Sequence, residues 1–248
     1  MDSAFINPSH HQVAYAIPAN ETDMPASQKP YVYPDYSIAE RLADGVVHFI
    51  GVSGALIASI ALITLVSGPG SLSDLFATWV YAAMIITAFV ASAAYHMTPR
   101  EDLRPALRRF DHAAIFLKIA GTYTPLVVLI GSNFSYLILG LVWAVALYGV
   151  SRRLFHWHEP GMGSTFLYLG LGWASLALAW PMTQSIPALS FWLVIAGGLT
   201  YTAGVIFYRW ESLRFSNAIW HVFVVAASAC HFFAIYFGEL AKQGNYPF

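Results

Sequence analysis

Residues 91–116 read ASAAYHMTPREDLRPALRRFDHAAIF, an arginine-rich hinge between two apolar runs. Ser92 and His96 lie at the end of the first run, and Asp111 lies at the beginning of the second. If both runs cross a membrane as helices, these three groups lie at the same depth on the same side of it. Ionisable groups at such a depth are costly and usually functional, so the stretch predicts a site.

The composition of the whole chain supports a membrane setting. Apolar residues make up 58% of the 248 residues, and charged residues only 10%, whereas soluble domains average roughly 25% charged residues. So few charges cannot cover the surface of a water-soluble domain. The single cysteine, Cys230, excludes an internal disulfide framework. The composition therefore indicates an integral membrane protein.

The N-terminal residues 1–36 differ in kind from the rest. They contain five prolines and no apolar run long enough for the core of a signal peptide. We predict a disordered cytoplasmic tail over 1–36, because such a segment cannot bury enough apolar surface to fold. A seven-helix membrane domain is predicted over 37–248.

Seven apolar segments follow the tail, each close to the ~20 residues that a helix needs to cross the hydrocarbon core. Short linkers that contain Gly, Pro and Ser separate them. A helical bundle satisfies every backbone group internally, as lipid demands. The sequence therefore predicts an all-α membrane protein, a seven-transmembrane helix bundle with spans at 43–66, 75–97, 110–130, 134–151, 163–181, 188–209 and 216–237.

The basic residues of the linkers indicate the orientation of this bundle. The linkers after the second, fourth and sixth predicted helices carry eight arginines, and the linkers after the first, third and fifth carry no Lys or Arg. Cytoplasmic loops are the ones enriched in Lys and Arg. We therefore predict a cytoplasmic N-terminus and a C-terminus outside. The eight arginines are Arg100, Arg104, Arg108, Arg109, Arg152, Arg153, Arg209 and Arg214.

Four of the predicted helices bring polar side chains to the cytoplasmic layer. Where two or three come from one helix, they are four residues apart and so share a face. One such residue alone could be an ordinary interfacial or capping group, but agreement in depth among four helices favours a single site. The residues are Glu40, Asp44 and His48 in the first helix, Ser92 and His96 in the second, Asp111 in the third, and Asn217 and His221 in the seventh.

Four stretches carry a family resemblance: YSIAERLADGVVH, SAAYH, FDHAAIFLKIAGTYTP and NAIWHVFVVAASACHFFAIY. In this order they resemble the hemolysin III branch of the progestin and adipoQ receptor family, over about residues 36–238. That family includes the adiponectin receptors and is distantly similar to the alkaline ceramidases. The resemblance implies a seven-helix bundle with its N-terminus inside, in agreement with the arginine count.

The resemblance also implies a zinc ion near the cytoplasmic face, bound by one residue of the second helix and two of the seventh. The matching positions are His96, Asn217 and His221. This chain departs from the family at Asn217, where the family has a histidine, and zinc prefers an imidazole nitrogen to an amide oxygen. It departs again at Asp44, where the family usually has asparagine, and a carboxylate there could offset the lost ligand.

A zinc site of this kind would support hydrolysis, because zinc lowers the pKa of a bound water to near neutrality and polarises a carbonyl group. The candidate catalytic residues are Ser92, Asp111 and Glu40, which match polar positions of the family. Asp111 would accept a proton, and Ser92 would orient the water or an oxyanion. A substrate that enters from the inner leaflet would be a lipid amide or ester. Alternatively, the ion only holds helices together.

A second class of function stays open beside hydrolysis. The family name refers to lysis of red cells, and its bacterial members are linked to membrane energy homeostasis, so the protein could perturb or conduct across the membrane. Lys118 lies seven residues after Asp111 on the same helix face, where it could pair with a carboxylate or line a polar path. We expect membrane lipid as the partner, no nucleic acid, and a multi-pass location in the inner (plasma) membrane.

The arginine count makes a direct prediction about topology. A reporter that is active only in the cytoplasm should be active when fused after Arg153 and silent when fused after Phe248, since these positions flank the fourth and seventh spans. The opposite pattern would reverse the orientation and move the polar layer to the outer side.

Overall fold

The structure is a computed structural model and describes residues 33, 35–68, 70–155, 162–210 and 212–245. The chain divides into two units, residues 1–33 and residues 34–248, and the helices described below all belong to the second. Nearly all of the predicted tail over 1–36 lies outside the described residues. Its predicted disorder therefore stays a prediction.

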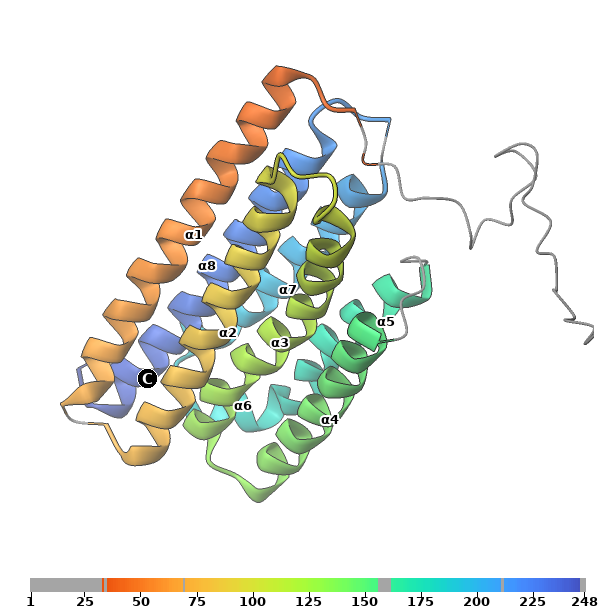
Figure 1. Cartoon of the computed structure of the whole chain (residues 1–248). Coiled ribbons are helices and arrows are strands. Elements are labelled where there is room, and N and C mark those ends of the chain that lie inside the picture. Colours follow the sequence, from red (N-terminus) through yellow and green to blue (C-terminus); the bar gives the residue numbers. More distant parts are fainter. Residues whose placement is uncertain (1–32, 34, 69, 156–161, 211, 246–248) are drawn as a thin grey trace, which may run out of the picture. The chain divides into compact units, whose positions relative to one another are not determined.

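Helices are the only regular secondary structure among the described residues, and short loops join them (Figure 1). Seven helical segments among them are long and apolar enough to cross a membrane, and the fifth of these runs through α5, η2 and α6. The predicted all-α fold with seven spans is confirmed. The elements are α1 (Ile38–Ser67), α2 (Leu72–Met97), α3 (Arg104–Ile130), α4 (Asn133–Phe155), α5 (Met162–Trp173), the 3₁₀ helix η2 (Ala174–Leu178), α6 (Ala179–Ser185), α7 (Ala188–Arg209) and α8 (Ser216–Lys242).

Two helices, α1 and α3, begin five or more residues earlier than predicted, for local reasons. At the start of α1, the Glu40 N–H donates to Ser37 Oγ and the Ser37 N–H donates to Glu40 Oε2, at 3.4 and 3.0 Å. This capping box starts the helix five residues before the predicted span. The start of α3 has Pro105 in its first turn, where the missing N–H costs nothing. Because arginine is a good helix former, much of the predicted arginine-rich hinge is helical.

The fifth span is broken rather than continuous, which the sequence analysis did not predict. The α-helix ends at Trp173, one 3₁₀ segment follows, and α6 resumes the path. The Tyr123 hydroxyl of α3 lies 3.0 Å from the Leu171 carbonyl oxygen and 2.7 Å from that of Gly172, and donates to them. The Tyr123 hydroxyl thus supplies a hydrogen bond to backbone carbonyls at the point where the α-helical hydrogen bonds end.

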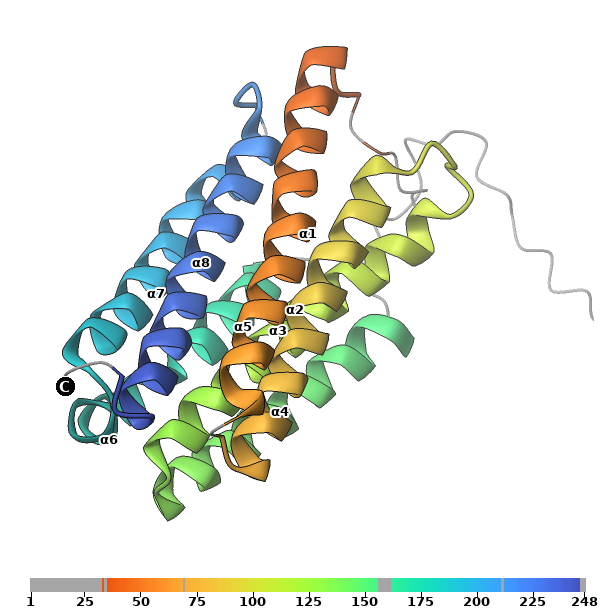
Figure 2. The ribbon, with the colours of Figure 1, turned by 90° about the vertical axis from the view of Figure 1, so that its left-hand side faces the viewer.

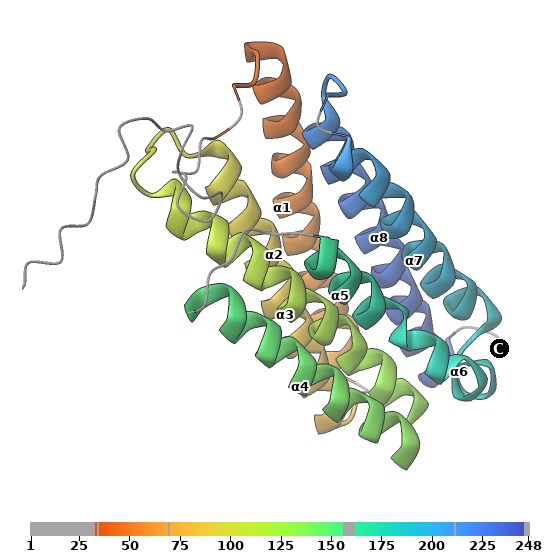
Figure 3. The ribbon, with the colours of Figure 1, turned by 90° about the vertical axis from the view of Figure 1, so that its right-hand side faces the viewer.

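The packing places α3 at the centre of the bundle. It is the most buried of the seven spans: 56% of the residues in its 18-residue apolar stretch are buried inside the bundle. Helix α2 packs along it on one side and α4 on another (Figure 2), and α5 lies between the α3–α4 pair and α7 (Figure 3). Helix α8 packs against α7 and α1. Large apolar side chains such as Phe49 and Trp192 face outward, as expected for helices in contact with lipid.

The contacts at the helix ends define two ends of the bundle. At one end the Phe215 N–H, just before α8, donates to Glu40 Oε1 of α1 at 3.1 Å. At the other, the Gln243 side chain donates to the Leu65 carbonyl oxygen of α1 at 3.2 Å. Helices α1 and α8 therefore run parallel, and α2 runs antiparallel to them (Figure 2). Which end faces the cytoplasm stays a prediction.

Candidate metal centre

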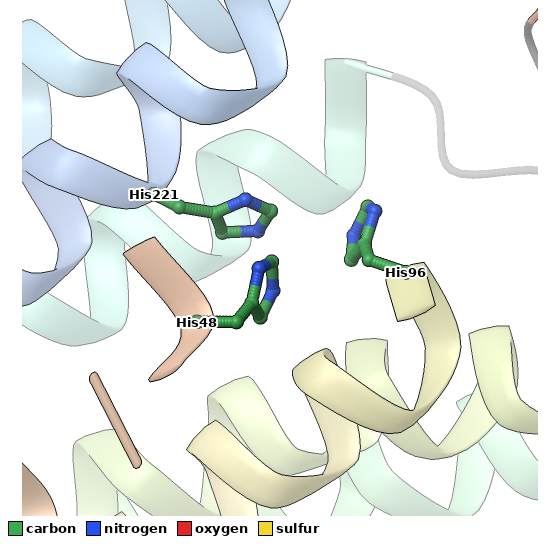
Figure 4. A group of neighbouring side chains, drawn as sticks. All are labelled: His48, His96 and His221. Atoms are coloured by element: carbon green, nitrogen blue, oxygen red, sulfur yellow. The ribbon is translucent and has the colours of Figure 1, made fainter. Parts of the chain in front are cut away.

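Three histidines from three helices meet near the end where α1 and α8 begin (Figure 4). They are His48 of α1, His96 of α2 and His221 of α8, and one ring nitrogen of each lies within 4.8 Å of the others. The side chains of His48 and His221 are buried, and that of His96 is 10% exposed. A cluster of imidazoles with so little access to water is a candidate metal centre.

A close approach of α1 to α2 brings His48 into this cluster. Gly51 lies one turn beyond His48, and a Cβ atom there would lie 2.7 Å from the ring of Phe89 on α2. Only a residue without a side chain allows the two helices to pack at this distance. The same approach places His48 Nε2 3.3 Å from the hydroxyl of Ser92, one turn further along α2.

The carboxylate of Asp44 contacts every member of the cluster. Its Oδ1 accepts the Nδ1–H of His221 at 2.7 Å, and its Oδ2 accepts from the Asn217 amide nitrogen at 2.7 Å. The Nδ1 atoms of His48 and His96 lie 3.5 and 3.8 Å from the same carboxylate. Asp44 is only 5% exposed, so these groups replace its hydration.

The hydrogen bonds fix the tautomers of two of the three imidazoles. His48 Nδ1 lies 2.8 Å from the Asp44 backbone carbonyl oxygen, which can only accept, so Nδ1 carries the proton. His221 Nδ1 donates to the Asp44 carboxylate in the same way. Both Nε2 atoms therefore keep a lone pair, and both lie near Ser92 Oγ, at 3.3 and 3.4 Å. Two ring nitrogens that could each bind a metal ion thus face one point.

Asn217 lies at the edge of the cluster with its amide nitrogen turned toward it. The nitrogen donates to the Asp44 carboxylate, an acceptor only, which sets the orientation of the amide. It also lies 3.2 Å from Nδ1 of His96. Asn217 therefore positions Asp44 and His96 in this arrangement, and its predicted role as a metal ligand through oxygen stays a prediction.

The predicted catalytic pair, Ser92 and Asp111, adjoins the cluster. The Ser92 hydroxyl lies between the Nε2 atoms of His48 and His221. Asp111 of α3 is 13% exposed, interacts with Ser92, and lies within electrostatic reach of His221. A carboxylate and a hydroxyl thus lie beside the candidate metal ligands, and their predicted part in catalysis stays a prediction.

Glu40, the third predicted catalytic residue, joins two helix starts. Its Oε2 accepts from the Ser37 N–H and hydroxyl, and its Oε1 accepts the Phe215 N–H. Phe215 has a positive φ of 62°, a conformation that costs a bulky residue free energy. The Glu40 carboxylate therefore holds the entry of α8 in place, and its predicted part in catalysis stays a prediction.

The donor set fits a zinc ion. Three neutral imidazoles with a fourth position left open is the ligand set of catalytic zinc, and a carboxylate that accepts the distal N–H of a ligating histidine is its usual support. Nitrogens that share one tetrahedral zinc lie about 3.3 Å apart, so binding would draw the three rings of His48, His96 and His221 closer together than in Figure 4.

The sequence analysis missed His48 as a candidate ligand. It placed His48 on the face of α1 that carries Glu40 and Asp44, but it took the ligand positions from the family resemblance. The signal was present in the spacing: His48 lies two turns beyond Glu40, about 12 Å along the helix, and this is the depth of Ser92. Three histidines on three helices at one depth would have identified the cluster.

The fold and the centre together define a class of protein: a multi-pass integral membrane protein with a buried histidine cluster at one end of its helical bundle. The chain belongs to the haemolysin-III related family, whose profile matches residues 36–232. The predicted resemblance to hemolysin III proteins is confirmed, as is the predicted location as a multi-pass protein of the plasma membrane.

Bacterial and animal relatives match most of the bundle. The chain is 33% identical over 205 residues to the hemolysin-3 homolog of Bacillus subtilis, which covers 82% of this chain and 95% of that protein. Hemolysin-3 of Bacillus cereus is 32% identical over 201 residues, covering 81% and 92%. The human monocyte to macrophage differentiation factor is 29% identical over 169 residues, covering 64% and 68%.

The geometry predicts which imidazoles are needed for zinc binding. His48→Ala should lower zinc content well below that of the unaltered protein, which should hold about one ion per chain, and should remove the rise in melting temperature on adding zinc. Asn217→His should tighten zinc binding, because it adds a nitrogen ligand beside His96. Zinc content of protein purified in mild detergent, with melting curves with and without zinc, measures both effects.

His231→Ala is the matched control. This histidine lies on α8 ten residues past His221, about 15 Å further along the helix, so its loss should leave zinc content unchanged. Equal zinc content in the His48→Ala protein and the unaltered protein would remove His48 from the ligand set.

Proposed function

We propose that this protein is a zinc-dependent hydrolase of a membrane lipid amide or ester, with its active site at the cytoplasmic face. One observation carries the proposal: a three-histidine cluster, a serine hydroxyl and an acidic side chain converge from four helices on one point. A structural metal would need the histidines alone, whereas the adjacent Ser92 and Asp111 supply groups that a reaction requires.

In this proposal His48, His96 and His221 hold the ion, and the residues around them orient the rings. Asp44 accepts the Nδ1–H of His221, which fixes the orientation of the ring and keeps its Nε2 available. The amide of Asn217 holds the other oxygen of the same carboxylate. The change of the family histidine to Asn217 is thus offset by His48, which comes from α1 instead of α8.

The chemistry divides between the ion and the chain. A bound zinc ion supplies an acidic water and polarises the substrate carbonyl group. Asp111 would accept a proton from the attacking water and return it to the leaving group, since it is the carboxylate beside Ser92. The nearby His112 Nδ1 lies 3.6 Å from this carboxylate and donates instead to the Arg108 carbonyl oxygen. Ser92 donates its hydroxyl hydrogen to the oxyanion or orients the water from its place between two imidazoles.

The surroundings of the centre support an amphiphilic substrate. On α1 the side chains of Leu42, Val46 and Phe49 are 68%, 49% and 73% exposed, and they lie on the face that turns away from Asp44 and His48. Lipid tails can therefore contact the helix that supplies a ligand. The loop after α2 is polar, with Arg100 paired to Asp102, and suits a lipid headgroup. Apolar side chains on α1 thus suit the tail of a lipid, and polar side chains after α2 suit its headgroup.

A specific observation keeps ion conduction as a second candidate function. Lys118 of α3 is 8% exposed, and its ammonium group lies 4.5 Å from the ring centre of Phe89 and 5.1 Å from that of Tyr201. Among the described residues it forms no ion pair, so aromatic faces stabilise its charge. The Tyr201 hydroxyl in turn lies 3.2 Å from the Ser228 hydroxyl. Polar groups thus continue into the bundle beyond the histidine centre.

The two candidate functions predict different responses to two substitutions. If the protein is a hydrolase, Asp111→Asn should reduce fatty-acid release from a lipid amide or ester by at least about 100-fold, the usual contribution of a general base. Lys118→Leu should leave most of that activity. Product release by purified protein in mixed micelles measures both, and zinc content verifies that Asp111→Asn keeps the ion.

Asp35→Asn makes the same chemical change at an exposed residue just before α1, and should retain full activity. If no lipid is hydrolysed but liposomes leak in the presence of the protein, and the leak depends on Lys118, then conduction replaces hydrolysis as the function.

A further inference from the structure

A second buried polar cluster lies at the other end of the bundle, where α1 ends, α2 begins and α8 ends (Figure 1). Asp74 in the first turn of α2 is 2% exposed, and Glu239 near the end of α8 is 1% exposed. Lys242, one turn beyond Glu239, has a side chain that is 42% exposed. Two buried carboxyl groups therefore lie near a single, partly exposed ammonium group.

The ammonium group is already committed to one of the two acids. Lys242 Nζ lies 2.5 Å from Asp74 Oδ1, and Asp74 Oδ2 accepts the Ser71 N–H at 3.0 Å. Both oxygens of Asp74 thus have donors, and its charge is balanced by Lys242. This pair requires nothing further.

Glu239 has no such compensation. Both of its side-chain oxygens are buried and lack any hydrogen-bond partner among the described residues. The charged groups that face it are Asp74 and Lys242, which balance each other. The last thirds of α1 and α3 and the first third of α7, which lie at this end, carry no charged residue. A bare carboxylate in these surroundings is strongly unfavourable, so a positive charge must accompany Glu239.

Other oxygen atoms near this end also lack partners. Among the described residues, the hydroxyls of Thr78 on α2 and of Ser59 on α1 are buried and have no hydrogen-bond partner. Thr78 lies one turn from Asp74, on the same face of α2. The contact of Gln243 with Leu65 places Glu239 beside the last third of α1. Three adjacent helices therefore present oxygen acceptors at one end, and hard cations prefer such ligands.

We propose that Glu239 is the anchor of a binding site for a monovalent cation, a proton or a sodium ion, at the end of the bundle opposite the histidine centre. One uncompensated carboxylate balances a single positive charge, and the hydroxyls that accompany it are neutral. A divalent ion would leave an excess of positive charge in a buried place. The site shares no residue with the histidine centre and does not depend on the proposed hydrolysis.

The experiment measures the melting temperature of the full-length protein in mild detergent under two series of conditions. One series replaces choline chloride with sodium chloride at constant pH and ionic strength, and the other varies the pH in choline chloride. A sodium site predicts a rise of about 5 °C at saturating sodium. A proton site predicts a melting temperature that falls as the pH rises, because deprotonation leaves a buried negative charge. Either response supports the proposal.

Glu239→Gln keeps the size of the side chain and removes its charge, so it should fold and should lose whichever response the unaltered protein shows. Glu101→Gln, which changes an exposed acid in the loop after α2, should have no effect. If the unaltered protein and Glu239→Gln respond identically to both sodium and pH, no cation binds at Glu239.

Discussion

The buried carboxylate of Asp44 is the interaction on which the histidine centre depends. A charge that is 5% exposed within a helical bundle is tolerable only where donors replace water. Here the donors are the Nδ1–H of His221 and the amide of Asn217, both on α8. The requirement to satisfy one carboxylate therefore fixes the rotation of α8 relative to α1. It also turns the Nε2 of His221 toward Ser92 and the other two imidazoles.

This arrangement gives the two departures from the family pattern a common physical reason. The resemblance places an asparagine at the position of Asp44 and a histidine at that of Asn217. In this chain the Asn217 amide donates to the Asp44 carboxylate at 2.7 Å. Asn217 therefore supplies a donor for the buried carboxylate of Asp44, and Asp44 supplies an acceptor for the amide of Asn217. The third imidazole of the cluster comes from His48, one turn beyond Asp44 on α1. The cluster in this chain takes one histidine from each of three helices, α1, α2 and α8.

Hydropathy predicted the seven spans, because lipid imposes length and apolarity on each helix separately. Features that depend on contacts between helices were not predictable in the same way. The break after Trp173 is tolerated because Tyr123 of another helix satisfies its carbonyls. His48 was missed because its approach to α2 depends on Gly51 and Phe89. The predicted seventh span ended at residue 237, since Glu239 and Lys242 lower hydropathy there, whereas α8 continues to Lys242.

The central claim is that three imidazoles from α1, α2 and α8 bind one zinc ion. The most direct test is the zinc-edge X-ray absorption spectrum of the purified, zinc-loaded protein, which reports the type, number and distance of the ligands. The account predicts three imidazole nitrogens at about 2.0–2.1 Å and one further light atom, with no sulfur. A spectrum with fewer than three imidazoles, or one that is unchanged in the His48→Ala protein, would contradict it.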